Sequence, residues 1–140
     1  MRAEWPDDLP MAVRLSATDW ADGGWTLEES IELSRRLKAA GVDLIDFSSG
    51  ALVPGVKYPD GPSWQVPLAE AIRKGAGIPT AAVGVITDPA QADEIVANGR
   101  ADLVLIGKAS LRDPYWPYHA AKALGQGDKV HLPTPYDYAV

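Results

Sequence analysis

Short apolar runs alternate along the chain with longer segments in which apolar residues recur every three or four positions. The short runs are typical of strands, and the longer segments are typical of helices. Four strands are predicted, at residues 11–16, 43–48, 79–84 and 102–106. Four helices are predicted between and after them, at residues 27–40, 67–74, 89–98 and 114–124. The pattern therefore predicts a strand-helix unit repeated four times, followed by a loop-like tail.

Local signals indicate where two of these helices begin and where one of them ends. Thr26 stands just before two acidic residues, and both features favour a helix start. Gly41 follows the same segment, at the position where a terminating glycine uses a positive φ. Thr87 or Asp88 can cap the third helix, and Pro89 suits its first turn. These signals predict helices that begin near residues 27 and 89.

The alternation of strands and helices predicts an α/β fold with a parallel sheet covered by helices. Right-handed crossovers allow two arrangements, a segment of a (β/α)₈ barrel or an open doubly wound sheet. Periodicity alone does not separate them. The 140 residues fit a single domain, residues 1–140, whereas a complete barrel needs about 250 residues. If the sheet belongs to a barrel, we expect the chain to hold only part of it.

Composition and charge narrow the classes of partner. Thirteen basic and nineteen acidic residues give a net charge of −6, which argues against a nucleic-acid partner. The chain has no cysteine, which excludes disulfides and thiolate metal sites. No run approaches the ~20 apolar residues of a membrane span, and no signal-peptide pattern is present, so we expect a cytoplasmic protein without a membrane partner. His119 and His131 have no partner at a metal-ligand spacing, so no metal site is expected.

Residues suited to ligand binding cluster at or just after the predicted strands. Arg14 lies near the end of the first predicted strand, and Ser49 directly follows the second. Gly84 and Gly107 close the last two strands. In α/β barrels, ligands meet the loops at the C-terminal ends of the strands, and phosphates often bind after the last two. Glycine lets a ligand approach the backbone closely, and N–H groups at a helix start favour an anion. With the point charge of Lys108, this pattern predicts a phosphate site at Gly84, Gly107 and Lys108.

Several motifs in one order carry a resemblance to a known family. They include Gly84 within Val-Gly-Val-Ile-Thr, Gly107 within Ile-Gly-Lys, and an Arg-Leu-Ser-Ala-Thr-Asp run that begins at Arg14. The full set lies at residues 14–19, 41–46, 48–50, 65–67, 83–87, 98–103, 106–108 and 111–114. Together they resemble the Old Yellow Enzyme family, in particular its bacterial NADPH dehydrogenase and xenobiotic reductase group. The resemblance implies strands five to eight of a (β/α)₈ TIM barrel, its C-terminal half. It also implies an FMN cofactor, NADH or NADPH as electron donor, and reduction of activated alkenes.

The resemblance assigns a role to each candidate residue. Arg14 would lie beneath the flavin near N1 and the C2 carbonyl, where a guanidinium stabilises the anionic reduced ring. Gly84, Gly107 and Lys108 would hold the FMN phosphate. The family usually has arginine in place of this lysine, so Lys108 keeps the charge and lacks the bidentate fork. Ser49 would lie near the flavin ring and the ribityl chain.

Structural alternatives stand beside these roles. Arg14 also fits a surface or salt-bridged arginine that ends a strand, and Ser49 fits a polar turn. Tyr115 is expected to fill the core, while Trp116 fits either the core or the dimethylbenzene edge of FMN. The resemblance implies that the family's alkene-activating pair, two histidines or a histidine and an asparagine, and its proton-donating tyrosine lie upstream of the matched segment. We therefore assign no catalytic residue.

Three functions follow as alternatives. The chain is the FMN-binding portion of an NAD(P)H-dependent ene-reductase with a small-molecule substrate, a half-barrel that binds FMN or another phosphate compound without turnover, or a self-associating structural fragment. Whether the chain alone is an enzyme stays open. A half-barrel leaves two sheet edges and one inner face uncovered, which favours association. We therefore expect a homo-oligomer or a complementary half-barrel chain as partner.

Overall fold

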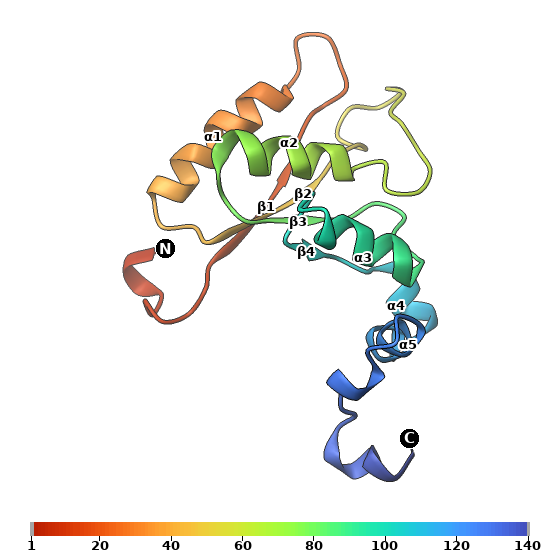
Figure 1. The fold of residues 1–140 in the computed structure, drawn as a ribbon. Helices are drawn as coiled ribbons and strands as arrows, with labels where there is room; N and C mark the ends of the chain where they lie inside the picture. The colour runs from red at the N-terminus through yellow and green to blue at the C-terminus, as the bar shows by residue number, and fades with distance from the viewer. Residues whose placement is uncertain (1, 140) are drawn as a thin grey trace.

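The computed structural model describes residues 2–139, which form a four-stranded parallel sheet with helices packed on it (Figure 1). The strands are β1 (Ala12–Ser16), β2 (Leu44–Ser48), β3 (Thr80–Ala82) and β4 (Leu103–Val104). The α-helices are α1 (Leu27–Ala39), α2 (Val66–Ala76), α3 (Pro89–Ala97), α4 (Lys108–Arg112) and α5 (Trp116–Ala123). Short 3₁₀ helices occur at η1 (Arg2–Glu4), η2 (Gly127–Lys129) and η3 (Thr134–Ala139). No helix within residues 2–139 has both the length and the apolar character needed to cross a membrane.

The order of the strands decides between the two arrangements that the sequence leaves open. The strands pair as β1-β2-β3-β4, which is their order in the chain, and every pairing is parallel. A doubly wound sheet reverses its order at a switch point and carries helices on both faces. Here α1, α2 and α3 all lie on the same face of the sheet (Figure 1). The predicted α/β half of a (β/α)₈ barrel is therefore confirmed.

Alternation along the strands divides the side chains between the two faces of the sheet. Ile45 and Phe47 of β2 are fully buried in the core that the helices close. Asp46 stands between them and belongs to the other face, in register with Arg14 of β1. On that face the side chain of Arg14 is 57% exposed and Leu103 of β4 is 51% exposed. This open face is therefore exposed at its outer strands β1 and β4, whereas Asp46 and Ala81 on its two inner strands are covered.

Capping explains why α1 and α3 begin where the sequence predicts. The Thr26 hydroxyl accepts a hydrogen bond from the Glu29 N–H, and the Glu29 carboxylate accepts one from the Thr26 N–H at 2.8 Å. Asp88 and Gln91 form the same capping box at the start of α3. Gly41 follows α1 with a φ of 88°, the positive value predicted for its position. The predicted starts of both helices are confirmed.

The structure confirms the last predicted helix and adds a short helix before it. The helix predicted over residues 114–124 is α5, whereas α4 precedes that range and is not predicted by the sequence. Asp113 between them is extended, with φ −138° and ψ 94°, because a residue before proline avoids the helical region. Tyr115 precedes α5 and is 49% exposed, so its expected core position is wrong. Trp116 packs against the core, and its Nε1 donates to the Thr87 carbonyl at 3.2 Å.

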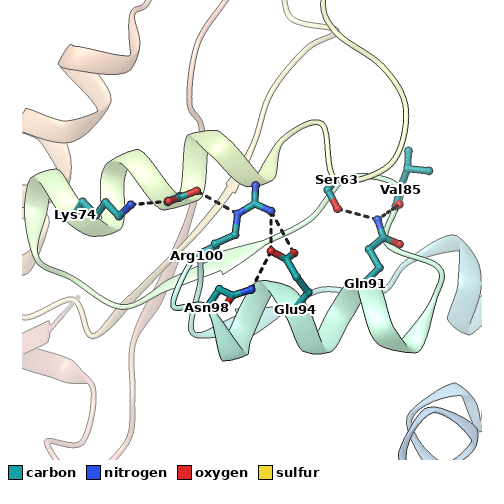
Figure 2. Close-up of polar contacts among 8 residues, drawn as sticks. Ser63, Lys74, Val85, Gln91, Glu94, Asn98 and Arg100 are labelled. Atoms are coloured by element: carbon teal, nitrogen blue, oxygen red, sulfur yellow. Dashed lines mark hydrogen bonds and ion pairs between the residues drawn. The ribbon is translucent and has the colours of Figure 1, made fainter. Parts of the chain in front are cut away.

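Ion pairs fasten α2 and α3 to each other and to the sheet. Arg100 donates from Nε to Glu70 of α2 at 3.1 Å and from Nη1 to Glu94 of α3 at 3.2 Å (Figure 2). Arg73 of α2 donates through two nitrogens to the Asp102 carboxylate, at 2.9 and 3.0 Å. The hydrogen bond from Arg73 lowers the pKa of the Asp102 carboxyl, although burial opposes this shift. These contacts keep both helices in place above β3 and β4.

We predict that the purified chain associates through its open sheet. Within residues 2–139, β1 and β4 each pair with a strand on one side only, and unpaired edges favour pairing with another chain. We expect homodimers in which two half-barrels cover each other's open faces. Sedimentation velocity over a wide concentration range measures this association. A monomer at every concentration would contradict homodimerisation and leave a complementary half-barrel chain as the expected partner.

Candidate functional site

A cleft lies at the edge of the sheet where the chain leaves β3 and β4. Its volume is about 440 Å³. Residues after β3 and residues around the start of α4 line it, together with Trp64 and Gln65 from the segment that leads into α2. Three predicted site residues, Gly84, Gly107 and Lys108, come together in this lining. They converge because parallel strands that are neighbours end at the same edge of the sheet.

The turn after β3 has an unusual backbone conformation. Gly84 has a φ of 119°, and Val85 has a φ of 52°. A β-branched residue rarely adopts the left-handed region, and such strain costs about 1–3 kcal/mol. Within residues 2–139, no protein group accepts a hydrogen bond from the N–H of Gly84, Val85 or Ile86. A turn that presents successive unpaired N–H groups is typical of an anion-binding site.

Residues around α4 bring positive charge to the same cleft. A Cβ at Gly107 would meet no atom within 4 Å, so the space beside this residue is open. Lys108 and Arg112 are one turn apart on α4, and both line the cleft. In the described part of the chain, neither forms an ion pair with an acidic residue. Two cations without acidic partners therefore line the same cleft as the unpaired N–H groups.

Ser49 lies outside this lining and is joined to it by Gln65. The Ser49 N–H donates to Oε1 of Gln65, whose side chain is buried. The Ser49 hydroxyl accepts a hydrogen bond from Trp20 Nε1 at 3.0 Å. Gln65 lines the cleft and packs closely on Gly84, where a Cβ would lie 3.0 Å from Nε2. Ser49 thus lies in a polar turn, which is the structural alternative that the sequence offers for it. Its contact with a flavin stays a prediction.

Arg14 also lies outside the cleft lining, in the middle of β1 on the open face of the sheet. Its Nη1 donates to Asp46 Oδ2 at 2.9 Å. Burial raises the pKa of the Asp46 carboxyl, and the nearby charge of Arg14 opposes this shift. Among the residues that the structure describes, the buried Oδ1 of Asp46 has no hydrogen-bond partner. Arg14 is therefore salt-bridged, inside the strand rather than at its end, and its position beneath a flavin stays a prediction.

Aromatic stacking supports the loop at residues 51–64, which carries Trp64 into the cleft. The rings of Tyr58 and Trp64 stack with their centroids 5.4 Å apart and an interplanar angle of 18°. Trp20, from the loop after β1, lies 6.4 Å from Trp64 between ring centroids. Tyr58 also packs on the backbone of Gly50, where a Cβ would lie 3.2 Å from its ring. This loop, rich in proline and glycine, is thus held by stacking between its own aromatic rings and by contacts with Gly50 and Trp20.

Sequence reasoning assigns no site role to several residues of the cleft lining, among them Trp64, Gln65 and Arg112. Arg112 lies four positions after Lys108, a spacing that places two side chains on one side of a helix. That signal requires α4, which the sequence analysis does not predict. Trp64 and Gln65 reach the cleft through the fold of a long loop, and no local pattern in the sequence indicates that path.

The chain matches one family model over most of its length. The model is described as the NADH:flavin oxidoreductase / NADH oxidase family and matches residues 4–126. The NADPH dehydrogenase of Geobacillus thermodenitrificans (strain NG80-2) is 51% identical over 130 residues, which cover 93% of this chain and 37% of that protein. The NADPH dehydrogenase of Halalkalibacterium halodurans is 50% identical over 132 residues, which cover 94% of this chain and 38% of that protein. The chain thus spans less than two fifths of the length of these relatives.

Two solved structures share the fold. A complex of 2-naphthoyl-CoA reductase with 2-naphthoyl-CoA superposes with a TM-score of 0.76 and 31% identity, covering 90% of this chain and 20% of that chain. Histamine dehydrogenase from Rhizobium sp. 4-9 superposes with a TM-score of 0.64 and 23% identity, covering 85% of this chain and 17% of that chain. The second likeness shows the fold alone. In both cases the chain corresponds to one part of a larger enzyme chain.

The geometry of the cleft predicts different effects of alanine at its two glycines. Gly84→Ala should destabilise the fold by about 1–3 kcal/mol, because an L-residue is strained at this φ and the methyl would press on Gln65. Gly107→Ala is the matched control and should change stability by less than about 0.5 kcal/mol, because the space beside it is open. Urea unfolding of both variants measures the difference. Equal losses would mean that Gly84 is not conformationally required.

Proposed function

Since the chain belongs to the NADH:flavin oxidoreductase / NADH oxidase family, we propose that it forms the FMN-binding portion of an NAD(P)H-dependent ene-reductase. This membership confirms the resemblance to Old Yellow Enzymes that the sequence predicts. The family implies FMN as the cofactor, and the relatives named NADPH dehydrogenase imply NADPH as the electron donor. Reduction of an activated alkene is the more specific part of the proposal.

The cleft at β3 and β4 carries this proposal, because its groups fit a phosphate. Unpaired N–H groups at residues 84–86 and the charges of Lys108 and Arg112 line one concave space. A phosphate dianion accepts hydrogen bonds from such donors and is attracted by the cations. Arg112 has the planar fork that Lys108 lacks, so a bidentate donor remains in the cleft although lysine replaces the usual arginine. We assign the FMN phosphate to Gly84, Gly107 and Lys108, with Arg112 as a second cation.

The open face of the sheet offers a second contact to the same cofactor. When bound, FMN would supply the redox chemistry, which is hydride transfer between a nicotinamide and an acceptor. We propose that Arg14 lies near flavin N1 and the C2 carbonyl, where its charge stabilises the reduced anion. The ion pair with Asp46, at 2.9 Å, would hold the guanidinium in a fixed orientation. In this proposal Ser49 borders the ring and the ribityl chain.

The proposed substrates are small molecules in which a carbon–carbon double bond is conjugated to a carbonyl group. The likeness to a reductase in complex with 2-naphthoyl-CoA supports this class, because an aromatic acyl thioester is itself a conjugated acceptor. A cytoplasmic location belongs to the same proposal, because NADPH is available there to reduce the flavin. Neither the substrate class nor the location is inferred from the residues of the cleft.

A half-barrel that binds FMN without turnover is the second candidate function. The chain has two histidines, His119 and His131, and neither lines the cleft. The His119 Nδ1 lies 2.7 Å from Asp113 Oδ2, a contact between exposed side chains of the C-terminal region. Neither histidine belongs to a strand of the open face, where the flavin ring is proposed to bind. A self-associating fragment that binds no flavin is the third candidate.

We predict that Lys108→Ala weakens FMN binding by about 1–3 kcal/mol, because a charge-assisted contact to the phosphate is lost. Quenching of flavin fluorescence on titration of the purified chain measures the dissociation constant. Lys129→Ala in η2 is the matched control, since it removes an exposed lysine outside the cleft, and its affinity should equal that of the wild type. The difference between the two variants should shrink at high salt.

Flavin titration and an NADPH oxidation assay separate the candidate functions. Saturable quenching that weakens in Lys108→Ala supports the proposed phosphate site, and an unchanged affinity at low and high salt removes Lys108 from it. Absence of quenching by the wild type leaves the self-associating fragment. NADPH oxidation that an activated alkene such as cyclohexenone accelerates above a free-FMN control distinguishes turnover from binding alone.

A further inference from the structure

One side chain bonds to both segments that flank the cleft. Gln91, in the first turn of α3, donates from Nε2 to Ser63 Oγ at 2.8 Å and to the Val85 carbonyl at 2.9 Å (Figure 2). Its Oε1 accepts hydrogen bonds from the Thr87 N–H at 3.0 Å and from the Asp88 N–H at 3.4 Å. Both the donor and the acceptor end of this amide are therefore engaged.

Both residues that receive the Nε2 hydrogen bonds have a strained backbone. Ser63 has a φ of 59°, and Val85 has a φ of 52°. Residues other than glycine keep such values only where their surroundings fix them. Ser63 directly precedes Trp64 and Val85 directly follows Gly84, and both Trp64 and Gly84 line the cleft. A single amide group thus fixes the backbone next to two parts of the cleft lining.

The hydrogen bond to Val85 also sets the direction of a backbone donor. In a trans peptide the C=O group and the following N–H point in opposite directions. Because Nε2 of Gln91 holds the Val85 carbonyl, the N–H of Ile86 points away from that amide. Ile86 lines the cleft, and within residues 2–139 its N–H has no acceptor. Gln91 therefore keeps this donor available to a ligand.

We propose that Gln91 is a positioning residue for the phosphate-binding turn at residues 84–86. It acts through Val85 and Ser63 and does not touch the ligand, and the inference rests on the proposed binding of FMN. The cap of α3 requires only an acceptor at this position, which glutamate supplies as well as glutamine. The donor of the glutamine amide is the part that serves the turn.

Gln91→Met tests this role, because methionine matches the length of glutamine and forms neither hydrogen bond. We expect the Kd for FMN to rise about tenfold, the effect of one lost net interaction. Riboflavin lacks the phosphate, so its Kd should change by less than about twofold. Flavin fluorescence titration measures both constants. A general loss of structure would weaken the two flavins alike, and that result would overturn the proposal.

Asp88→Ala is the matched control. It removes the other half of the same capping box and leaves the hydrogen bonds from Gln91 to Ser63 and Val85 in place. Its melting temperature should fall because the cap is lost, while its Kd for FMN should not rise by more than about twofold. If Asp88→Ala weakens FMN binding as much as Gln91→Met does, Gln91 acts only as a helix cap.

A measurement without flavin separates this inference from the proposed function. If the wild-type chain does not bind FMN, the proposed function fails, and the amide resonances of residues 84–86 then decide the role of Gln91. In ¹H–¹⁵N spectra these resonances should move in Gln91→Met and keep their wild-type positions in Asp88→Ala. Wild-type positions in both variants would show that Gln91 does not hold the turn.

Discussion

Parallel pairing of the strands in the order of the chain is the constraint on which the rest of this structure depends. Each strand must return through a right-handed crossover, so α1, α2 and α3 cover one face of the sheet and leave the other face uncovered. The same pairing places the ends of β3 and β4 side by side. Gly84 and Gly107, far apart in the sequence, therefore meet in one cleft. The geometry of the site is a consequence of the topology of the sheet.

Much of this arrangement could be predicted because its causes are local. The helix starts at Thr26 and Asp88 follow from side chains that bond to backbone N–H groups within three residues, and such signals are visible in a short window of sequence. The strands are apolar runs, and the glycines stand where two of these runs end. Given a parallel sheet, the convergence of Gly84, Gly107 and Lys108 requires no further information.

The remaining features depend on contacts between distant segments. Ser63 and Gln91 are 28 positions apart, and their hydrogen bond arises only once the loop before α2 has folded beside α3. Arg112 reaches the cleft because a short helix begins at Lys108, four positions after the end of the two-residue strand β4. Tyr115 is exposed and lies just before α5, whereas the helix predicted from the sequence includes it. Side-chain periodicity does not report any of these contacts.

The central claim is that an FMN phosphate binds to the unpaired N–H groups of residues 84–86 beside Lys108 and Arg112. Titration of the ¹⁵N-labelled chain with FMN, and separately with riboflavin, tests it most directly through the amide resonances of individual residues. The account predicts that the resonances of Gly84, Ile86 and Gly107 move on addition of FMN and move far less with riboflavin, which lacks the phosphate. Shifts of equal size with both flavins, or shifts confined to residues outside the cleft, would contradict the account.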